Sequence, residues 1–295
     1  MSADSDIPES RALPMADAAP IDEWEIANLD LEAYLKRLAY SGPLTPDAAT
    51  LRELHRAHAA KIAFENLDVL LGRGIALDLD SVQDKLVRRA RGGYCFEHNL
   101  LLAAALERLG YPVTRLAARV VLAGGVRSHM LLRVMADDRP WLADVGFGAS
   151  LLEPLAFDTR SPVRQGGWTY RLDHDERRDV WLLRSKDVTG WTDLYEFTLE
   201  PQRQIDYVVY NHYTSTHPRS PFVSQVVALR TEPEIQYALR SRQLTTKRPD
   251  ATTTGRDIAV EELPGVLATT FGIHLDAKET TELLRRAARP TARPT

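Results

Sequence analysis

Apolar side chains in the first third of the chain recur every three or four residues, which is the spacing of one face of an α-helix. The stripe starts near residue 29, and its first members are Leu31, Tyr34, Leu35 and Leu38. The same spacing returns in three later segments, 51–58, 81–90 and 96–109. Glycines at 92 and 93 separate the last two segments, so Cys95 falls at the start of a helix. This pattern predicts a helical bundle over 23–110.

After Pro112 the spacing changes to short apolar runs that are rich in Val, Leu and aromatic residues. The runs are 114–122, 128–136, 139–147, 168–174 and 180–185. Turn residues such as AGG, ADDR and DERRD separate them. Because short apolar runs between turns are typical of antiparallel strands, we predict an antiparallel sheet or β-barrel over 111–210.

The last third of the chain mixes both kinds of pattern. It contains strand-like runs at 205–213, 222–229 and 235–244, a Pro/Ser-rich loop, and an amphipathic segment at 279–286. We therefore expect a smaller α/β region over 211–287. Together the three parts predict an α+β multidomain fold.

The two ends of the chain lack a sustained period. Residues 1–22 are rich in Ala, Ser, Asp and Pro, and residues 288–295 repeat Pro and Arg. We expect both to be flexible, because their apolar content is too small to offset the entropy of ordering. The acidic start has no basic and apolar signal segment, so we expect a cytoplasmic protein.

Charge and composition exclude several classes of protein. The chain has 295 residues with 37 Lys+Arg against 41 Asp+Glu, a formal net charge of −4. A protein that neutralises many phosphates needs a basic surplus, so we expect no nucleic acid partner. The longest apolar stretch, 100–106, is far shorter than the ~18 residues of a membrane-spanning helix, so we expect no membrane partner. One cysteine excludes an intramolecular disulfide and a cysteine-rich zinc site.

The segment RGGYCFEHN (91–99) carries that cysteine, Cys95, directly after two glycines. The thiolate is the reactive form of cysteine, and the free N–H groups and dipole of a helix N-terminus stabilise it. The pattern is therefore typical of a cysteine nucleophile. A buried structural cysteine is the alternative, although glycines that allow another group to approach the backbone favour the nucleophile.

A cysteine nucleophile needs a base and a group that orients the base. His129 lies in a strand-like run downstream of Cys95, and Asp144 lies at the end of the next run. The intervening hairpin can bring the imidazole and the carboxylate together on one face of a sheet. An ordinary sheet histidine and an aspartate in an Asx-turn are the alternatives.

The other histidines near these motifs do not form a recognisable metal pattern. His98 lies one helical turn after Cys95, and His55 and His58 lie on one face of a predicted helix. We interpret all three as packing residues and expect no metal site, because no second cysteine or HxxxH pair is present. The glycine signatures of nucleotide binding, GxGxxG and GxxxxGK[ST], are also missing.

Five blocks of the sequence together resemble the arylamine N-acetyltransferase family, which uses acetyl-CoA. They are HRAHAAKIAFENLDV (55–69), RGGYCFEHN (91–99), SHMLLRV (128–134), WLADVGFG (141–148) and NHYTSTHPRSPF (211–222). The resemblance extends over about 24–286. It implies that Cys95 is the acyl-accepting nucleophile, His129 its base and Asp144 the orienting carboxylate.

The resemblance also implies a fold and further contacts. The expected fold is a helical bundle, a central antiparallel β-barrel and a C-terminal α/β lid around a core like that of cysteine proteases and transglutaminases. Candidate contacts to coenzyme A are Gly124, Thr216 and Ser220. Candidate substrate contacts are the aromatic rings of Phe147 and Phe222.

Two further features of the sequence follow from the same comparison. Glu65 and Arg91 resemble the buried polar pair of the family, which would support the cysteine loop because a buried charge needs a partner. Ala63 stands where the family commonly has proline, a departure that bears on loop rigidity and not on the three candidate catalytic residues.

The implied activity is two-step acetyl transfer with ping-pong kinetics. The cysteine would take the acetyl group from acetyl-CoA and pass it to a small aromatic amine or hydrazine, without a metal. Within the family, an amide synthase that releases a polyketide thioester would use the same triad. A cysteine peptidase or transglutaminase shares the Cys-His-Asp order, and a binding module with a packing cysteine is the non-enzymatic alternative.

Overall fold

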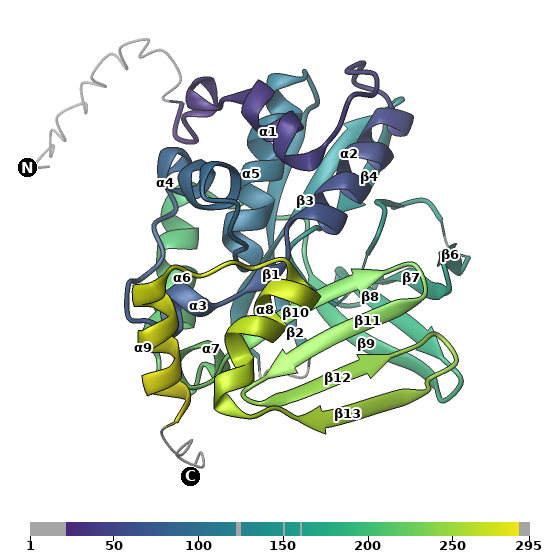
Figure 1. Cartoon of the computed structure of the whole chain (residues 1–295). Coiled ribbons are helices and arrows are strands. Elements are labelled where there is room, and N and C mark those ends of the chain that lie inside the picture. Colours follow the sequence, from purple (N-terminus) through teal and green to yellow (C-terminus); the bar gives the residue numbers. More distant parts are fainter. Residues whose placement is uncertain (1–21, 122–124, 150, 160, 289–295) are drawn as a thin grey trace, which may run out of the picture.

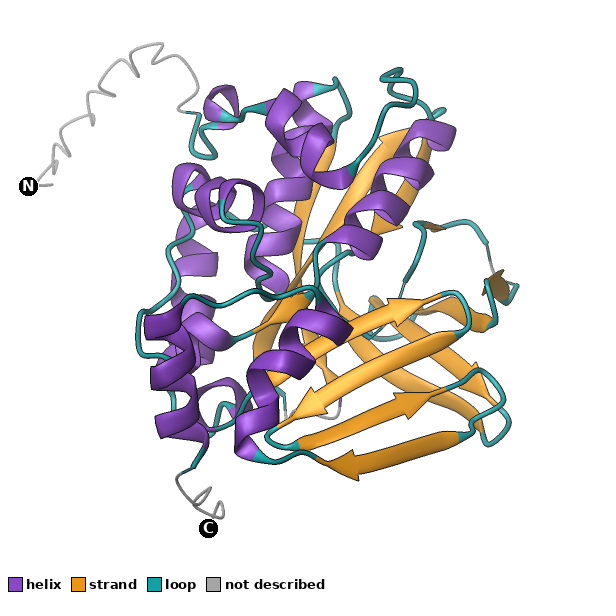
Figure 2. Ribbon diagram, in the orientation of Figure 1, coloured by secondary structure: helices purple, strands orange, loops and turns teal. Residues whose placement is uncertain are grey.

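The computed structural model describes residues 22–121, 125–149, 151–159 and 161–288 (Figures 1 and 2). Structural statements below refer to these residues. The predicted extension 1–22 and tail 288–295 lie outside them except for one residue each, and Gly124 lies outside them as well. No helix in the described ranges is long and apolar enough to cross a bilayer.

The N-terminal part of the described chain is helical, as predicted. Its elements are η1 (Ile26–Asn28), α1 (Leu31–Leu38), α2 (Ala48–Lys61), α3 (Leu67–Leu70), α4 (Leu79–Gln83), the π-helical turn η2 (Asp84–Arg88) and α5 (Cys95–Arg108). Aspartates begin three of them: the carboxylates of Asp30, Asp47 and Asp78 accept hydrogen bonds from main-chain N–H groups of the first turn. Every residue of α5 from Cys95 to Leu106 is buried, so α5 is the central helix of this part.

The middle of the chain forms an eight-stranded antiparallel sheet that curves into a nearly closed barrel, which confirms the predicted barrel. Its strands are β2 (Val113–Val120), β3 (Arg127–Ala136), β4 (Arg139–Ala143), β5 (Leu155–Ala156), β6 (Val163–Gln165), β7 (Trp168–Asp175), β8 (Val180–Asp187) and β9 (Gly190–Phe197). Their order in space is β5-β4-β3-β2-β9-β8-β7-β6. A tight turn at Asp137 and Asp138, both with positive φ, joins β3 to β4 and sets Leu132 opposite Ala143.

The C-terminal part is an α/β region, as predicted. It contains β10 (Val227–Glu232), β11 (Ile235–Arg240), β12 (Gln243–Lys247), β13 (Thr253–Asp257), η4 (Val260–Glu262), α8 (Leu263–Phe271) and α9 (Ala277–Ala287). Its sheet is completed by β1 (Phe64–Glu65), a strand from the N-terminal part that pairs with β10. Figure 1 shows β1 between the helical part and this sheet, so the two parts share a strand.

The predicted strand at 205–213 is wrong, because this segment forms helix α6 (Gln204–Thr216). Aromatic and β-branched residues favour a strand when neighbours alone are considered. In the folded chain, however, Tyr207, Asn211 and Thr214 are buried at helical spacing. The predicted boundary between 210 and 211 therefore falls inside a helix.

Three other segments differ in detail from the predicted elements. The predicted helix 81–90 is divided between α4 and η2. The run 222–229 contains the short helix α7 (Pro221–Ser224) before β10 begins. The run 235–244 is a hairpin and not one strand, because Ser241 takes a positive φ of 54° between β11 and β12.

Helix α5 should contribute strongly to stability through its fully buried side chains. Leu101→Ala removes a side chain that is 0% exposed and leaves a cavity against Tyr34 and Leu86. We expect this variant to lose about 2–5 kcal/mol of unfolding free energy in urea denaturation. Leu44→Ala is the matched control, because Leu44 is 45% exposed, and it should change the unfolding free energy by less than about 0.5 kcal/mol. Equal losses in the two variants would contradict the assignment of α5 as the core helix.

Candidate active site

The loop before Cys95 is held close to strand β1. The N–H of Glu65 donates to the carbonyl of Gly93 over 2.7 Å. A Cβ on Gly92 would lie 2.1 Å from the carbonyl oxygen of Ala63, so only glycine fits there. The loop ends where α5 begins at Cys95, which is 4% exposed and places its thiol 3.5 Å from the carbonyl oxygen of Ser128. The prediction of a cysteine at a helix N-terminus is confirmed.

A buried cluster of charged side chains packs against this loop. Arg91 donates to the carboxylate of Glu65 over 2.7 Å, which confirms the predicted buried pair. Its other terminal nitrogen donates to Glu279 of α9 over 2.9 Å. Lys85 lies 2.8 Å from Glu97, whose second oxygen accepts the N–H of Tyr94 and caps α5. The pairing satisfies these buried charges and ties α9, β1 and α5 to the cysteine loop.

The ionisation of this cluster follows from burial and pairing. Burial alone would lower the pKa of Lys85, but the carboxylates of Glu97, Glu65 and Asp68 outweigh it and raise that pKa. Burial raises the pKa of Glu97, against the opposing effect of Lys85. Lys85 is therefore a fixed cation.

The structure brings Cys95, His129 and Asp144 together from three different elements. His129 lies on β3, and its Nε2 is 2.7 Å from Oδ2 of Asp144, which follows the end of β4. Both side chains are nearly inaccessible, at 3% and 0% exposure. Because Nε2 is engaged by the carboxylate, Nδ1 of the imidazole is the nitrogen that can serve the thiol.

The carboxylate of Asp144 has three further hydrogen-bond donors. Asn99, one turn after Cys95 on α5, donates to Oδ1 over 3.0 Å, and the main-chain N–H of Gly146 donates to the same atom over 2.9 Å. Tyr195 of β9 donates its hydroxyl to Oδ2 over 2.9 Å. The sequence analysis missed Asn99 and Tyr195: Asn99 stands in the quoted RGGYCFEHN block, whereas nothing local marks Tyr195.

These contacts set the ionisation of the pair. Burial would lower the pKa of His129, but Asp144, with a smaller contribution from Cys95, outweighs it and raises the pKa to about 10. Burial would raise the pKa of Asp144, but His129, Asn99 and Gly146 lower it. The two side chains therefore form a buried imidazolium–carboxylate pair beside the thiol, an arrangement suited to proton transfer and to nucleophilic attack by sulfur.

The aromatic candidates lie close to these residues. The ring of Phe147 is 5.2 Å from that of His129, edge to face. Phe222 packs against Tyr94, the residue before Cys95, with 5.9 Å between ring centroids. Both rings are partly exposed, unlike the imidazole.

The hydroxyl groups of Thr216 and Ser220 donate hydrogen bonds to main-chain carbonyl groups. Thr216 is exposed at the end of α6 and donates to the carbonyl of His212 over 2.5 Å. Ser220 is buried, donates to the carbonyl of Thr214 over 2.5 Å and caps α7. The corner between α6 and α7 that carries them also carries Phe222.

Three further histidines, His55, His58 and His98, are buried, and burial keeps them neutral. Burial lowers the pKa of His98 to about 4 and that of His58 well below its ordinary value. His58 lies between the hydroxyl of Tyr34 at 2.9 Å and Nδ1 of His98 at 3.0 Å. Among the described residues, no group of three His, Cys, Asp or Glu side chains is arranged to hold a metal ion.

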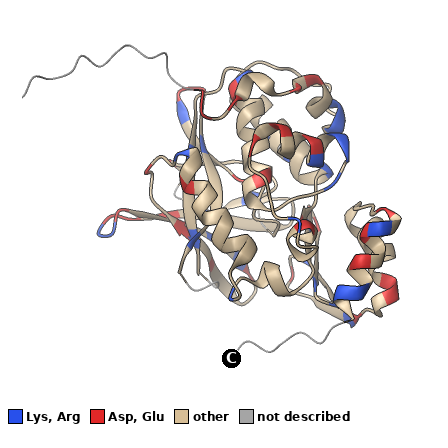
Figure 3. Cartoon of the chain, turned by 90° about the vertical axis from the view of Figure 1, so that its left-hand side faces the viewer, with Lys and Arg blue, Asp and Glu red and all other residues tan. Residues whose placement is uncertain are grey.

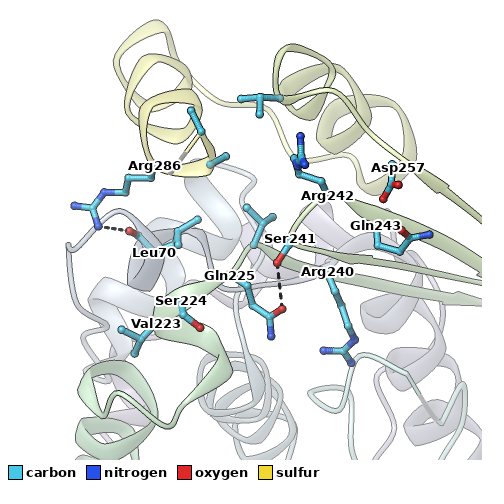
Figure 4. Close-up of a pocket in the computed structure, with 14 residues that line it drawn as sticks. Leu70, Val223, Ser224, Gln225, Arg240, Ser241, Arg242, Gln243, Asp257 and Arg286 are labelled. Atoms are coloured by element: carbon cyan, nitrogen blue, oxygen red, sulfur yellow. Dashed lines mark hydrogen bonds between the residues drawn. The ribbon is translucent and has the colours of Figure 1, made fainter. Parts of the chain in front are cut away.

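A hollow of about 730 Å³ lies away from Cys95, His129 and Asp144, between α7, α9 and the turn that joins β11 to β12 (Figure 4). Arg240, Arg242 and Arg286 line it, but their guanidinium groups point in different directions, and that of Arg286 donates to the carbonyl of Leu70. The three guanidinium groups therefore do not converge on one position where they could bind a ligand together. Helix α9, which lies next to the C-terminal trace in Figure 3, carries both acidic and basic side chains.

Comparison with known proteins identifies relatives over most of the chain. A family model described as N-acetyltransferase matches residues 47–280. The chain is 38% identical to the arylamine N-acetyltransferase of Mycolicibacterium smegmatis over 258 residues, 84% of this chain and 93% of that protein. The crystal structure of the Nocardia farcinica arylamine N-acetyltransferase is 42% identical, with a TM-score of 0.83 over 88% of this chain and 95% of that one. The Mycobacterium marinum arylamine N-acetyltransferase, solved in complex with CoA, is 36% identical, with a TM-score of 0.82 over 88% and 98% of the two chains.

The turn after Asp144 must approach α5 closely for this geometry to form. A Cβ on Gly146 would lie 2.6 Å from Nδ2 of Asn99 and 2.7 Å from the Cα of Cys95, and the main chain cannot give way. We expect Gly146→Ala to lose about 1–3 kcal/mol of unfolding free energy and to change the rate of Cys95 alkylation by iodoacetamide. Gly265→Ala is the control, because Gly265 lies in α8 with no atom within 4 Å of the added carbon. A Gly146 variant that matches this control in both measurements would contradict the close packing.

The raised pKa of His129 predicts a pH dependence of stability. In a Cys95→Ser background, which removes the titration of the thiol, the folded protein keeps a proton on His129 that the unfolded chain loses near pH 6.5. The stabilisation is complete below pH 6.5 and is lost as the pH rises through the pKa of His129 in the folded protein, which Asp144 still raises in this background. Between those values the unfolding free energy should fall by up to about 1.4 kcal/mol per pH unit. Adding Asp144→Asn should flatten this slope, and an unchanged slope would contradict the imidazolium–carboxylate pair.

Proposed function

The chain belongs to the arylamine N-acetyltransferase family, and we propose that it transfers an acetyl group from acetyl-CoA to aromatic amines or hydrazines through a thioester on Cys95. The observation that carries the proposal is the 2.7 Å contact between His129 and a buried Asp144, beside the thiol at the start of α5. In this proposal Cys95 is the nucleophile, His129 the acid and base, and Asp144 the carboxylate that orients the imidazole.

The first half-reaction loads the cysteine. The sulfur of Cys95 attacks the thioester carbonyl of acetyl-CoA, its own proton being held by His129 as the imidazolium. The bond between the carbonyl carbon and the CoA sulfur then breaks. His129 returns the proton to the departing sulfur, which leaves acetyl-Cys95 and free CoA.

The second half-reaction transfers the acetyl group from Cys95 to the nitrogen of the amine. The amine attacks the carbonyl carbon of acetyl-Cys95, and the neutral His129 takes the proton that the nitrogen gives up. The carbon–sulfur bond breaks, so the N-acetyl product departs and the thiolate of Cys95 is restored beside the imidazolium. The carboxylate of Asp144 stabilises that imidazolium and keeps Nδ1 directed toward the sulfur.

Acetyl-CoA is proposed as the donor because the Mycobacterium marinum relative is solved in complex with CoA. We assign the coenzyme to the corner between α6 and α7 that bears Thr216 and Ser220, together with Gly124. The two side-chain hydroxyls already donate to main-chain carbonyl groups. In this proposal the coenzyme would therefore contact main-chain groups of the corner and the exposed surface of Thr216.

The acceptor is proposed to be a small aromatic amine or hydrazine. The nitrogen of an arylamine is largely unprotonated at neutral pH and therefore nucleophilic. Phe147 stands edge-on to His129 and Phe222 packs against Tyr94, so the two partly exposed rings flank the nucleophile and can hold an aromatic ring.

Intact-protein mass spectrometry tests both half-reactions separately. Mixing the protein with acetyl-CoA should add one acetyl group, and adding an arylamine should remove it within the dead time of manual mixing. Cys95→Ser should acquire no adduct while keeping the circular dichroism spectrum of the wild type. Failure of the wild type to acquire an adduct from acetyl-CoA, although iodoacetamide alkylates its thiol, would overturn acetyl-CoA as donor and favour a different thioester.

A further inference from the structure

His55 of α2 lies directly behind the main chain of Asp144. The N–H of Asp144 donates to Nε2 of His55 over 3.1 Å, and Nδ1 of His55 is 3.1 Å from the carbonyl oxygen of Leu152. The imidazole is completely buried. It therefore connects α2, the end of β4 and the loop that leads to β5.

Both partners of this imidazole have fixed hydrogen-bonding roles. A main-chain N–H can only donate, so Nε2 must carry a lone pair, and a carbonyl can only accept, so Nδ1 must carry the proton. His55 is thus a neutral imidazole in one defined tautomer. Burial lowers its pKa to about 4, so it keeps this form at neutral and mildly acidic pH. The charged or titratable groups nearest to it are Asp144, Glu153 and His58.

We propose that His55 is a positioning residue of the active site, which holds the main chain of Asp144 while other groups hold the Asp144 carboxylate. The proposal rests on the assignment of Asp144 as the group that orients His129. Asn99, Tyr195 and Gly146 fix the carboxylate. They leave the N–H of Asp144 without a partner, and this is the group that His55 binds.

The energetic argument concerns a buried donor. A buried N–H that loses its acceptor is left without compensation for its removal from water, and the chain relieves that cost by moving the donor. Movement of the Asp144 main chain carries the carboxylate with it and lengthens the 2.7 Å contact to His129. A displacement of about 1 Å at a catalytic group can reduce the rate by up to about 100-fold.

Two substitutions of His55 test whether the hydrogen-bond acceptor at Nε2 matters, or only the volume of the side chain. The amide group of glutamine reaches the position of Nε2, so His55→Gln retains an acceptor for the Asp144 N–H. Asparagine reaches only the position of Nδ1, so His55→Asn retains the contact to Leu152 and loses the acceptor. His58→Asn is the structural control, because His58 is equally buried on the same helix but bonds to Tyr34 and His98.

The deciding measurement is the rate of Cys95 alkylation by iodoacetamide as a function of pH, which does not depend on acetyl transfer. We expect His55→Asn to shift the acidic limb of this profile to higher pH and to lower kcat for acetylation by about 10- to 100-fold with little change in KM. His55→Gln should keep the wild-type profile and remain within about threefold in kcat. His58→Asn should lower only the thermal midpoint.

The outcomes separate this proposal from the proposed function. A His55→Asn variant that loses thermal stability but keeps the wild-type alkylation profile would overturn the positioning role. A wild type that alkylates as expected but accepts no acetyl group would overturn the acetyl-CoA assignment and leave the role of His55 intact. If His55→Asn does not fold, imidazole ¹⁵N spectra of the wild type decide: a proton on Nδ1 of His55 is expected, and a proton on Nε2 would overturn the proposal.

Discussion

The carboxylate of Asp144 is a negative charge in a position that is 1% exposed. A charge removed from water to this extent is stable only when opposite charge and hydrogen-bond donors surround it. The donors come from β3, α5, β9 and the turn after β4. Because each donor must lie within about 3 Å, the central helix and the barrel can meet in only one arrangement at this point.

Buried charges also need partners in the ion cluster that packs against the cysteine loop. Arg91 and Lys85 are buried cations, and their carboxylate partners lie on β1, α3, α5 and α9. The C-terminal helix thereby contributes Glu279 to the support of a loop that lies far away in the sequence. Shared strand β1 adds main-chain hydrogen bonds to that connection. The three parts of the fold are therefore held together beside Cys95, the proposed nucleophile.

The chemistry follows from these two buried networks. The ion cluster and the glycines place Cys95 at the first position of a helix, where the helix dipole favours a thiolate. The Asp144 network raises the pKa of His129 to about 10, so an imidazolium lies beside the thiol of Cys95 at neutral pH. Both networks are made of the chain's own side-chain and main-chain groups, which fix the positions of the charges beside Cys95 and reduce the reorganisation needed during reaction.

The local sequence determined the helices that begin at capping aspartates and the position of Cys95 at a helix start, because periodicity and capping act between near neighbours. It also determined the barrel strands β2, β3, β4, β7 and β8, but it did not indicate β5, β6 and β9. It failed at 205–213, where β-branched and aromatic residues favour a strand and packing of Tyr207 instead makes a helix.

The candidate triad was predictable because its residues stand in motifs that resemble a known family. Tyr195, His55 and Glu279 were not, since they meet Asp144 or Arg91 only across separations of 51, 89 and 188 residues. Only the tertiary structure decided these contacts, because a buried charge or N–H selects whichever donor or acceptor the packed chain brings within reach, and that choice leaves no periodic trace in the sequence.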